Sequence, residues 1–160
     1  MFKKVIWATD GSDAADRALE VAAQLAAEAG GEVLAVHCVE ITMPGKGGGR
    51  MPVLADEDEV EAKIAKQVKQ LAERGVPAHM QLIRADVGNA AHAIAKIAKE
   101  HNAGVIVVGT RGRGPIAGLL LGSVTQRLLH TAPCPVLAVP VRKGTTVDSQ
   151  DRRHSQPAAV

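Results

Sequence analysis

Glycines near the C-terminal end of the chain are spaced in a way that suits phosphate binding. Gly109 is followed after two residues by Gly112 and after nine more by Gly122 and Ser123, and Arg111 lies inside the stretch. A strand-like apolar run ends at Gly109, and a helical pattern begins with Ser123 as its N-cap. The N–H groups of such a loop and the positive end of the helix dipole attract anions. The stretch therefore predicts a phosphate site, whereas isolated glycines would indicate only a flexible connection.

The next candidate for chemistry is Asp10, which ends the first strand-like run of the sequence. A carboxylate at this place can accept hydrogen bonds from sugar hydroxyls or from an adenine amino group. The same residue would also suit the cap of the following helix, because Asp-Gly-Ser is a turn sequence. Arg111 and Arg113 also allow two interpretations. Either one of these arginines contacts phosphate, or both are solvated charges in the loop.

The composition is that of one globular domain, with 160 residues of which 46% are hydrophobic and 22% are charged. A net charge of +2 without basic runs among aromatic residues gives little support for nucleic acid binding.

No apolar segment is long enough to span a membrane and no signal peptide is evident, so we expect a cytoplasmic protein. The six histidines show no metal-ligand spacing. Cys38 and Cys134 form no CxxC pair and are expected to be free thiols.

Strand-like and helical segments alternate along the chain. The sequence predicts strands over 4–9, 32–39, 77–85, 105–109 and 136–139, and helices over 12–29, 56–74, 88–102 and 123–131. Residues 40–56 are predicted to be an irregular loop of unknown role, and 142–160 a disordered tail that follows a domain over 1–141. This alternation favours a parallel sheet with helices on both faces. Ligands of such sheets lie at the carboxyl ends of the strands, where Asp10, Cys38–Val39 and Gly109 would converge.

Taken together, these segments resemble the universal stress protein family over residues 3–141. The spacing from Gly109 to Ser123 resembles the Gly-x2-Gly-x9-Gly-Ser pattern of its ATP-binding members, and residues 7–12, 36–39 and 132–139 also look like that family. The resemblance implies a Rossmann-like α/β fold of the adenine nucleotide alpha hydrolase type, an open parallel five-stranded sheet of order 3-2-1-4-5. It also implies a homodimer formed through the last strand, 136–140. Ala8 replaces a proline of other members, which removes no backbone donor.

The resemblance further implies a site for ATP, or for ADP or AMP, with Mg²⁺ or Mn²⁺ bridging the phosphates. Asp10 would contact the adenosine and the backbone around Cys38 would meet the adenine edge, whereas residues 109–114 would wrap the ribose and phosphates. Gly122 and the residues after it would hold the phosphate end. The implied binding residues are Ala8, Thr9, Asp10, Cys38, Val39, Gly109, Thr110, Arg111, Gly112, Arg113, Gly114, Gly122, Ser123, Val124 and Thr125.

A catalytic apparatus is not evident in the sequence. Hydrolysis needs a base for water and a means of stabilising charge on the transferred phosphoryl group, and no Walker motif or second strand-end carboxylate accompanies Asp10. We therefore expect a nucleotide-dependent regulatory module of the stress response, with no catalytic residue. One alternative is a slow ATPase or autophosphorylating protein with Ser123 or Thr125 as the acceptor. Another is a dimeric interaction protein that binds no nucleotide, which the glycine motif argues against.

Overall fold

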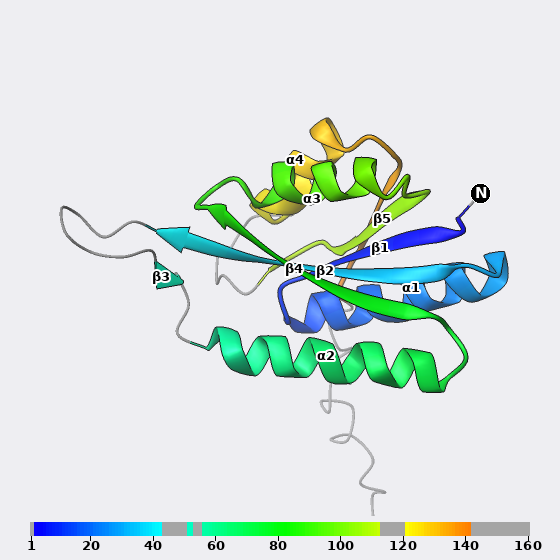
Figure 1. Ribbon diagram of the computed structural model, residues 1–160. Coiled ribbons are helices and arrows are strands. Elements are labelled where there is room, and N and C mark those ends of the chain that lie inside the picture. The colour runs from blue at the N-terminus through cyan, green and yellow to red at the C-terminus, as the bar shows by residue number, and fades with distance from the viewer. Residues whose placement is uncertain (1, 43–50, 53–55, 113–120, 142–160) are drawn as a thin grey trace, which may run out of the picture.

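The computed structural model describes residues 2–42, 51–52, 56–112 and 121–141, without the side chains of residues 51 and 52. The strands are β1 (Lys4–Thr9), β2 (Glu32–Thr42), β3 (Met51–Pro52), β4 (Ala78–Asp86), β5 (Val105–Gly109) and β6 (Val136–Val139). The helices are α1 (Asp13–Ala29), α2 (Glu57–Glu73), α3 (Ala90–Glu100) and α4 (Ser123–Thr131). Strands and helices alternate along the chain, and Figure 1 shows the helices in layers on either side of the sheet.

Five parallel strands form one sheet in the order β4-β2-β1-β5-β6. Counted along the chain, this is the order 3-2-1-4-5, so the predicted fold class is confirmed. β1 lies in the centre, with Val5 paired to Val33 of β2 on one side and to Val105 of β5 on the other. The chain adds β2 and β4 on one side of β1 and then β5 and β6 on the opposite side. The topological switch therefore lies between β1 and β5, where such folds form a crevice.

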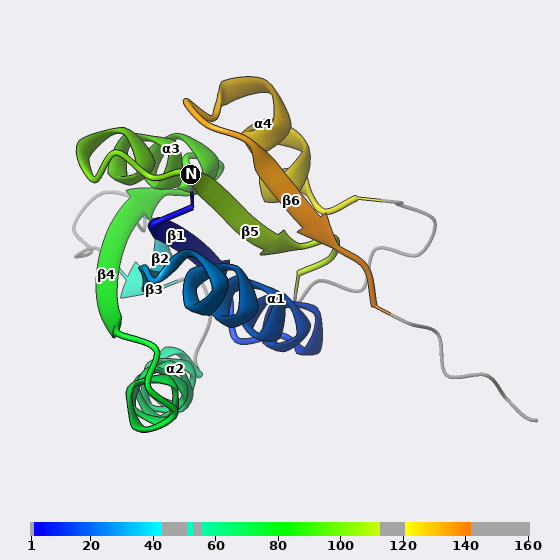
Figure 2. The same ribbon diagram turned by 90° about the vertical axis from the view of Figure 1, so that its right-hand side faces the viewer.

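The two faces of the sheet are covered by different helices. Val5 and Trp7 of β1 belong to a core cluster with α1 and α2, and the alternate residues Ile6 and Ala8 belong to a second cluster with α3 and α4. Figure 2 shows these two layers with the sheet between them. Alternation of side chains along each strand produces this division. Because alanines line much of the helix faces, the helices approach the sheet closely despite the scarcity of aromatic residues.

Helix α1 follows β1 through a tight turn and packs back on the sheet. Ser12 is its N-cap, with its Oγ accepting from Ala15 N–H at 3.3 Å, and Gly30 ends it in the left-handed conformation with φ of 57°. The indole Nε1 of the fully buried Trp7 donates to the Ala15 carbonyl at 2.8 Å. This bond satisfies the indole N–H and fixes the first turn of α1 against the central strand.

The predicted loop over 40–56 is wrong at residues 40–42 and 51–52, which are strands. Residues 40–42 continue β2, since Glu40 and Ile41 pair with residues of β4, and Ile41 and Thr42 pair with the antiparallel strand β3. The apolar run of the sequence ends earlier, but ladder hydrogen bonds to neighbouring strands prolong the strand beyond it. Residues 43–50 and 53–55 lie outside the described residues, as does the predicted tail 142–160.

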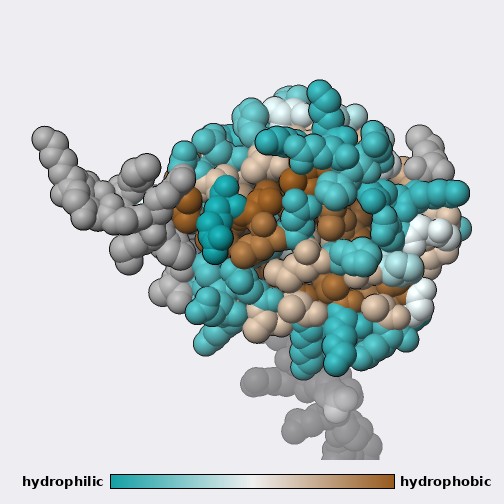
Figure 3. All heavy atoms as spheres, in the orientation of Figure 1, coloured by the Kyte–Doolittle hydropathy of each residue, from teal (hydrophilic) through white to brown (hydrophobic). Residues whose placement is uncertain are grey.

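The edge of the sheet formed by β4 lies on the face shown in Figure 3. Apolar surface occupies the middle of this face, between more hydrophilic helical surfaces above and below it. Side chains of β4 such as Met80, Leu82 and Ile83 are only partly buried. Among the helices that the structure describes, none has the length and apolar character needed to cross a membrane.

Candidate functional site

A cavity of about 190 Å³ lies at the carboxyl ends of β1, β2 and β5, where the topology places the switch. The N-terminal parts of α3 and α4 complete its wall. Ligand pockets usually measure roughly 300–1,000 Å³, so this space suits one moiety of a larger ligand whose remainder extends outward. The described lining residues are Ala8, Thr9, Asp10, Ala15, Cys38, Ala90, Ile94, Val108, Gly109, Arg111, Gly112, Gly122, Ser123, Val124 and Thr125.

Most residues of the predicted site come together at this cavity. Of the predicted set, Ala8, Thr9, Asp10, Cys38, Gly109, Arg111, Gly112, Gly122, Ser123, Val124 and Thr125 line it. Val39 and Thr110 do not: Val39 is buried in the sheet, and Thr110 joins the glycine loop to β6 through its N–H, which donates to Val139 O at 2.9 Å. Arg113 and Gly114 lie outside the described residues. That the lining residues bind a nucleotide stays a prediction.

Asp10 takes part in the turn before α1 and also lines the cavity, but it is not the cap of that helix. Its Oδ1 accepts from the N–H of Ser12 at 3.0 Å, and Ser12 rather than Asp10 caps α1. Its Oδ2 lies 2.7 Å from the position that a Cβ would take on Gly112. The carboxylate of Asp10 therefore connects the end of β1 to the glycine loop.

Gly109 is a glycine because of packing, a role that the phosphate-binding interpretation did not include. A Cβ at Gly109 would lie 2.8 Å from the main-chain carbon of Ala14, much closer than two carbon atoms can approach. The end of β5 consequently lies directly against the first turn of α1. The buried hydroxyl of Thr125 donates to Gly109 O at 2.8 Å and joins α4 to the same point. Gly109 thus brings two helices together at the cavity.

Helix α4 spans the predicted range, 123–131, but its N-cap is one residue earlier than expected. Gly122 is the N-cap, with φ of −64° and ψ of 154°, and Ser123 is the first helical residue, so the prediction of Ser123 as the cap is wrong. The N–H of Gly122 donates to Thr110 O at 2.7 Å, which fixes the entry of the chain into the helix. Since glycine carries no side chain, it cannot satisfy the N–H groups of the first helical turn. These groups lie at the cavity, where the helix dipole favours an anion.

An apolar wall faces the cavity from residues that sequence reasoning did not select. Ala90 and Ile94 of α3, Val108 of β5 and Ala15 of α1 contribute it. Their spacing is that of ordinary core residues, and the sequence carries no signal that separates core from cavity wall. Such a surface suits the face of a planar aromatic group, while the polar atoms at its border would fix the orientation of that group.

The turn before α3 is held from two sides. The N–H of Gly88 donates to Oε1 of Glu40 at 2.8 Å, and the carbonyl of Gly88 accepts from the guanidinium of Arg127. Gly88 has φ of +85°, a conformation that other residues rarely adopt. Contacts from β2 and α4 therefore fix the start of α3, and with it the cavity wall at Ala90.

Cys38 lines the cavity as a free, half-buried thiol. Burial raises the pKa of this thiol to about 11, with further electrostatic contributions from the nearby side chains of Glu40 and Glu57. Burial also raises the pKa of the Cys134 thiol, against a hydrogen bond from the backbone of Ile106. Both cysteines therefore stay protonated near neutral pH, and neither has the low pKa of a nucleophilic thiolate.

Among the described residues, no group of three or more His, Cys, Asp or Glu side chains could hold a metal ion. The charged groups on the described cavity wall are the Asp10 carboxylate and the exposed Arg111. The site therefore combines an apolar wall, one carboxylate, one guanidinium and an uncapped helix N-terminus. Chemically, this arrangement can hold a ligand that is apolar and planar at one end and anionic at the other.

Comparison with known proteins identifies the family. The model of the universal stress protein family matches residues 1–140. The chain belongs to this family. A universal stress protein of Thermus aquaticus is 38% identical over 139 residues, which cover 87% of this chain and 99% of that protein. Another, of Methanocaldococcus jannaschii, is 35% identical over 145 residues, which cover 87% of this chain and 82% of that protein.

Solved structures of universal stress proteins share the fold. The universal stress protein from Archaeoglobus fulgidus, solved in complex with dAMP, is 29% identical with a TM-score of 0.59. The match covers 87% of this chain and 98% of that chain. In the universal stress protein described here, the cavity at the strand ends is the place where a ligand is to be sought.

Proposed function

We propose that this universal stress protein binds adenine nucleotides, with ATP as the main ligand, and acts as a nucleotide-dependent regulatory module in the stress response. The observation that carries the proposal is the cavity at the switch point. It combines the Asp10 carboxylate, the glycine loop and the N-terminus of α4 with an apolar wall. These are the groups that a base, a sugar and a phosphate chain require.

Each part of the nucleotide has a matching part of the cavity. The adenine ring packs against the apolar wall near Ala90 and Ile94, and the sugar hydroxyls donate to Asp10. The phosphates extend toward Gly122 and the first-turn N–H groups of α4, with Arg111 as a source of positive charge. The position of a Cβ on Gly122 is at ordinary contact distance, 3.5 Å from Gly112 N, so the fold would accept a side chain there. Glycine at 122 is therefore better explained by a ligand than by packing.

Similarity supports the same ligand class. The Archaeoglobus fulgidus protein, 29% identical to this chain over nearly its whole length, is described in complex with dAMP. The glycine spacing from Gly109 to Ser123 resembles the pattern of ATP-binding members of the family, which favours a longer phosphate chain for this protein.

A divalent cation, Mg²⁺ or Mn²⁺, would bridge the phosphates of the bound ATP. The described residues form no carboxylate or imidazole cluster that could hold a metal ion without the nucleotide. Magnesium usually keeps several waters and takes one or two protein oxygens together with substrate phosphates. In this site the phosphates would be the main ligands, so the cation is expected to bind together with ATP.

The test is a measurement of bound and added nucleotide. The purified protein is denatured, and released ATP, ADP or AMP is identified by mass spectrometry. Thermal unfolding of nucleotide-free protein is then followed with ATP and Mg²⁺, with GTP as the matched control. ATP at a hundredfold excess over Kd should stabilise the fold by about 2.7 kcal/mol. If no nucleotide is released and ATP leaves the unfolding temperature unchanged, the proposal is wrong.

Slow hydrolysis or autophosphorylation is the alternative activity for the same site. Ser123 is exposed and lines the cavity, whereas the hydroxyl of Thr125 is buried and donates to Gly109 O. The structure therefore favours Ser123 over Thr125 as an acceptor of phosphate. ADP formation, or phosphate transfer to the protein that Ser123→Ala abolishes, would support this alternative. ATP that stays intact over hours supports the binding module.

We also propose that the protein forms a homodimer through the last strand, residues 136–140. β6 is an edge strand of the sheet, paired in the described chain with β5. Leu137 is 40% exposed and Val141 39% exposed, which are high values for large apolar side chains. An edge strand with exposed apolar residues favours pairing with another strand, and a second copy supplies an identical one.

A further inference from the structure

The carbonyl groups of Thr9 and Gly11, the residues before and after Asp10, are both held by side chains from elsewhere in the chain. The carbonyl of Thr9 is 2.9 Å from Nδ1 of His37, and the carbonyl of Gly11 accepts from Nζ of Lys63 at 2.7 Å. Since a carbonyl can only accept, Nδ1 of His37 carries the hydrogen and donates it. The Thr9–Asp10 and Gly11–Ser12 peptide groups are thus fixed by separate donors.

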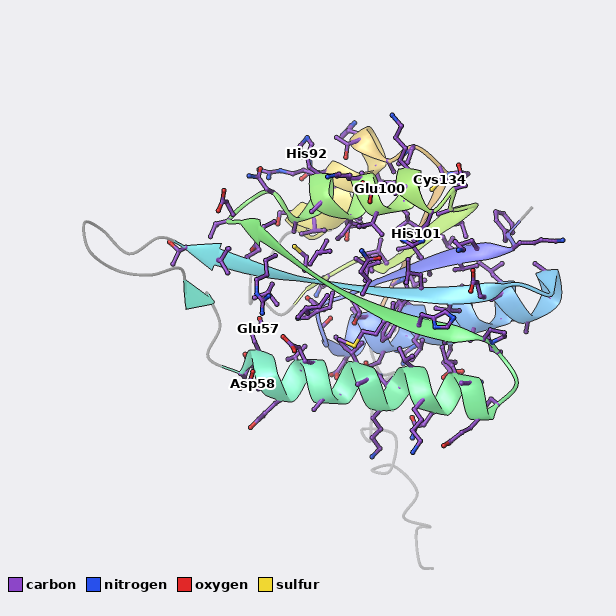
Figure 4. All side chains as sticks on the ribbon, viewed as in Figure 1. Glu57, Asp58, His92, Glu100, His101 and Cys134 are labelled. Carbon is purple, nitrogen blue, oxygen red and sulfur yellow. The ribbon has the colours of Figure 1, made fainter. Side chains whose placement is uncertain are left out.

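The first of these donors is held in turn by α2. Nε2 of His37 lies 2.7 Å from Oε2 of Glu57, in the first turn of α2, and the side chains are 1% and 9% exposed. Figure 4 shows Glu57 between α2 and the sheet. The bond needs one proton between these atoms, carried by an imidazolium or by a carboxylic acid. Either state gives a short, buried hydrogen bond that orients the ring toward Thr9.

The second donor, Lys63, lies on α2 itself, about two turns after Glu57. Nζ of Lys63 pairs with Oδ2 of Asp16 at 2.7 Å while it donates to Gly11, and Nε2 of Gln67 donates to Oδ1 of Asp16 at 2.8 Å. Gly11 has φ of +78°, and a Cβ on it would lie 2.8 Å from Cγ1 of Val60. Helix α2 therefore covers the turn after Asp10 and holds it to the start of α1.

Buried polar side chains concentrate at this place. Among the described residues, the buried polar or charged side chains are Thr9, His37, Glu57 and Thr125. Thr9 and Thr125 line the cavity, whereas His37 and Glu57 are behind it. Burial of a histidine–carboxylate pair costs desolvation energy and is weak evidence for a contribution to stability. A role in fixing the geometry of the site explains why the pair lies behind the Asp10 turn.

We propose that Glu57, acting through His37, and Lys63 are positioning residues for nucleotide binding. They fix the Thr9–Gly11 turn so that the Asp10 carboxylate is preorganised before the ligand arrives. The inference rests on the proposed function, because it takes Asp10 to contact the nucleotide. Without the two contacts, the turn would have to be ordered on binding, and that entropy cost would weaken the affinity.

The test compares ATP affinity among variants of the full chain by calorimetry, below every unfolding temperature. Lys63→Met and Glu57→Ala are each expected to weaken ATP binding about tenfold. Glu57→Gln should restore most of the loss, since an amide can donate to or accept from His37 without the extra proton. Lys69→Met is the matched control, because Lys69 lies on the same helix, is 79% exposed and pairs only loosely with Glu73 at 4.0 Å.

Two further measurements separate positioning from a general loss of structure. In an Asp10→Asn background, Lys63→Met should add little to the loss of affinity, because both changes act through the same carboxylate. Hydrogen exchange of the Ser12 amide, which is bonded to Oδ1 of Asp10, should be faster in nucleotide-free Lys63→Met and Glu57→Ala than in the wild type.

The outcomes distinguish the two proposals. A wild type that binds no nucleotide overturns the proposed function and this inference with it. A wild type that binds ATP, with Lys63→Met and Glu57→Ala binding equally well, overturns the positioning role alone. Equal losses in Lys63→Met and Lys69→Met would also overturn it, since they would indicate an effect of charge and not of the contact with Gly11.

Discussion

The Oδ2 atom of Asp10 lies 2.7 Å from the position that a Cβ atom would take on Gly112. Gly112 has no positive φ, so its backbone would accept other residues. A side chain at this position would displace the carboxylate of Asp10, which occupies that space. The Asp10 carboxylate at the end of β1 therefore packs closely against Gly112, although the two residues are far apart in the sequence.

Gly112→Ala is expected to displace the Asp10 carboxylate. We expect a loss of stability of about 1 kcal/mol and ATP binding about tenfold weaker. The reason is that the Asp10 side chain can make room for the new methyl group only by leaving its place between Ser12 and the loop. Chemical denaturation and calorimetry measure the two effects. In an Asp10→Ala background the contact is absent, so Gly112→Ala should cost no further stability. A full loss in that background would show that the Asp10 contact is not the cause.

Gly122→Val tests whether the start of α4 holds phosphate. A Cβ at Gly122 meets neighbours only at ordinary distances, 3.5 Å or more, so we expect the nucleotide-free fold to persist with a cost of about 1 kcal/mol or less. The larger side chain would keep phosphate away from the helix N-terminus, and the stabilisation by ATP should disappear. Thermal unfolding with and without ATP measures this.

The control for that variant is Ser123→Ala, which removes a hydroxyl but leaves every backbone N–H in place. If backbone donors hold the phosphates, Ser123→Ala should retain most of the ATP stabilisation. Stabilisation by ATP that is equal in Gly122→Val and in the wild type would contradict the assignment of phosphate to this helix.

The sequence was sufficient for the fold and for the location of the candidate site. Alternation of apolar strands and amphipathic helices predicts a parallel sheet, and the carboxyl ends of parallel strands meet at one edge. Asp10, Cys38 and Gly109 therefore had to come close to one another, and all of them line the cavity. The family resemblance, confirmed by the family match, supplied the strand order that these local patterns leave open.

Features that depend on contacts between distant segments could not be predicted. Gly109 is a glycine because Ala14 lies against it, which only the packing of α1 on β5 reveals. Ile94, which belongs to the apolar wall, has the helical spacing of an ordinary core residue. His37 and Glu57 are 20 residues apart on different elements, and neither belongs to a sequence motif that would pair them. The N-cap of α4 is Gly122 and not the predicted Ser123, since backbone geometry and not residue preference sets this cap.

Cys38 is expected to react slowly with alkylating agents. Its pKa of about 11, raised by burial foremost, means that the thiolate forms only as the pH rises toward that value. At pH 8 we expect alkylation about a hundredfold slower than for an ordinary thiol, in a Cys134→Ser background that isolates the residue. Bound ATP should slow it further, because Cys38 lines the cavity. The urea-unfolded protein is the control, and equal rates in the folded and unfolded protein would contradict the prediction.

Leu137→Asp is expected to convert the proposed dimer to a monomer. Leu137 is 40% exposed on the edge strand β6, and a carboxylate there would have to be buried without a partner when two copies associate. We expect at least a tenfold weaker association, measured by size-exclusion chromatography with light scattering over a range of concentrations. Leu129→Asp is the matched control, because Leu129 is 50% exposed but lies on α4 and not on the edge strand itself. A wild type that is monomeric at high concentration, or equal dissociation in both variants, would exclude β6 as the dimer interface.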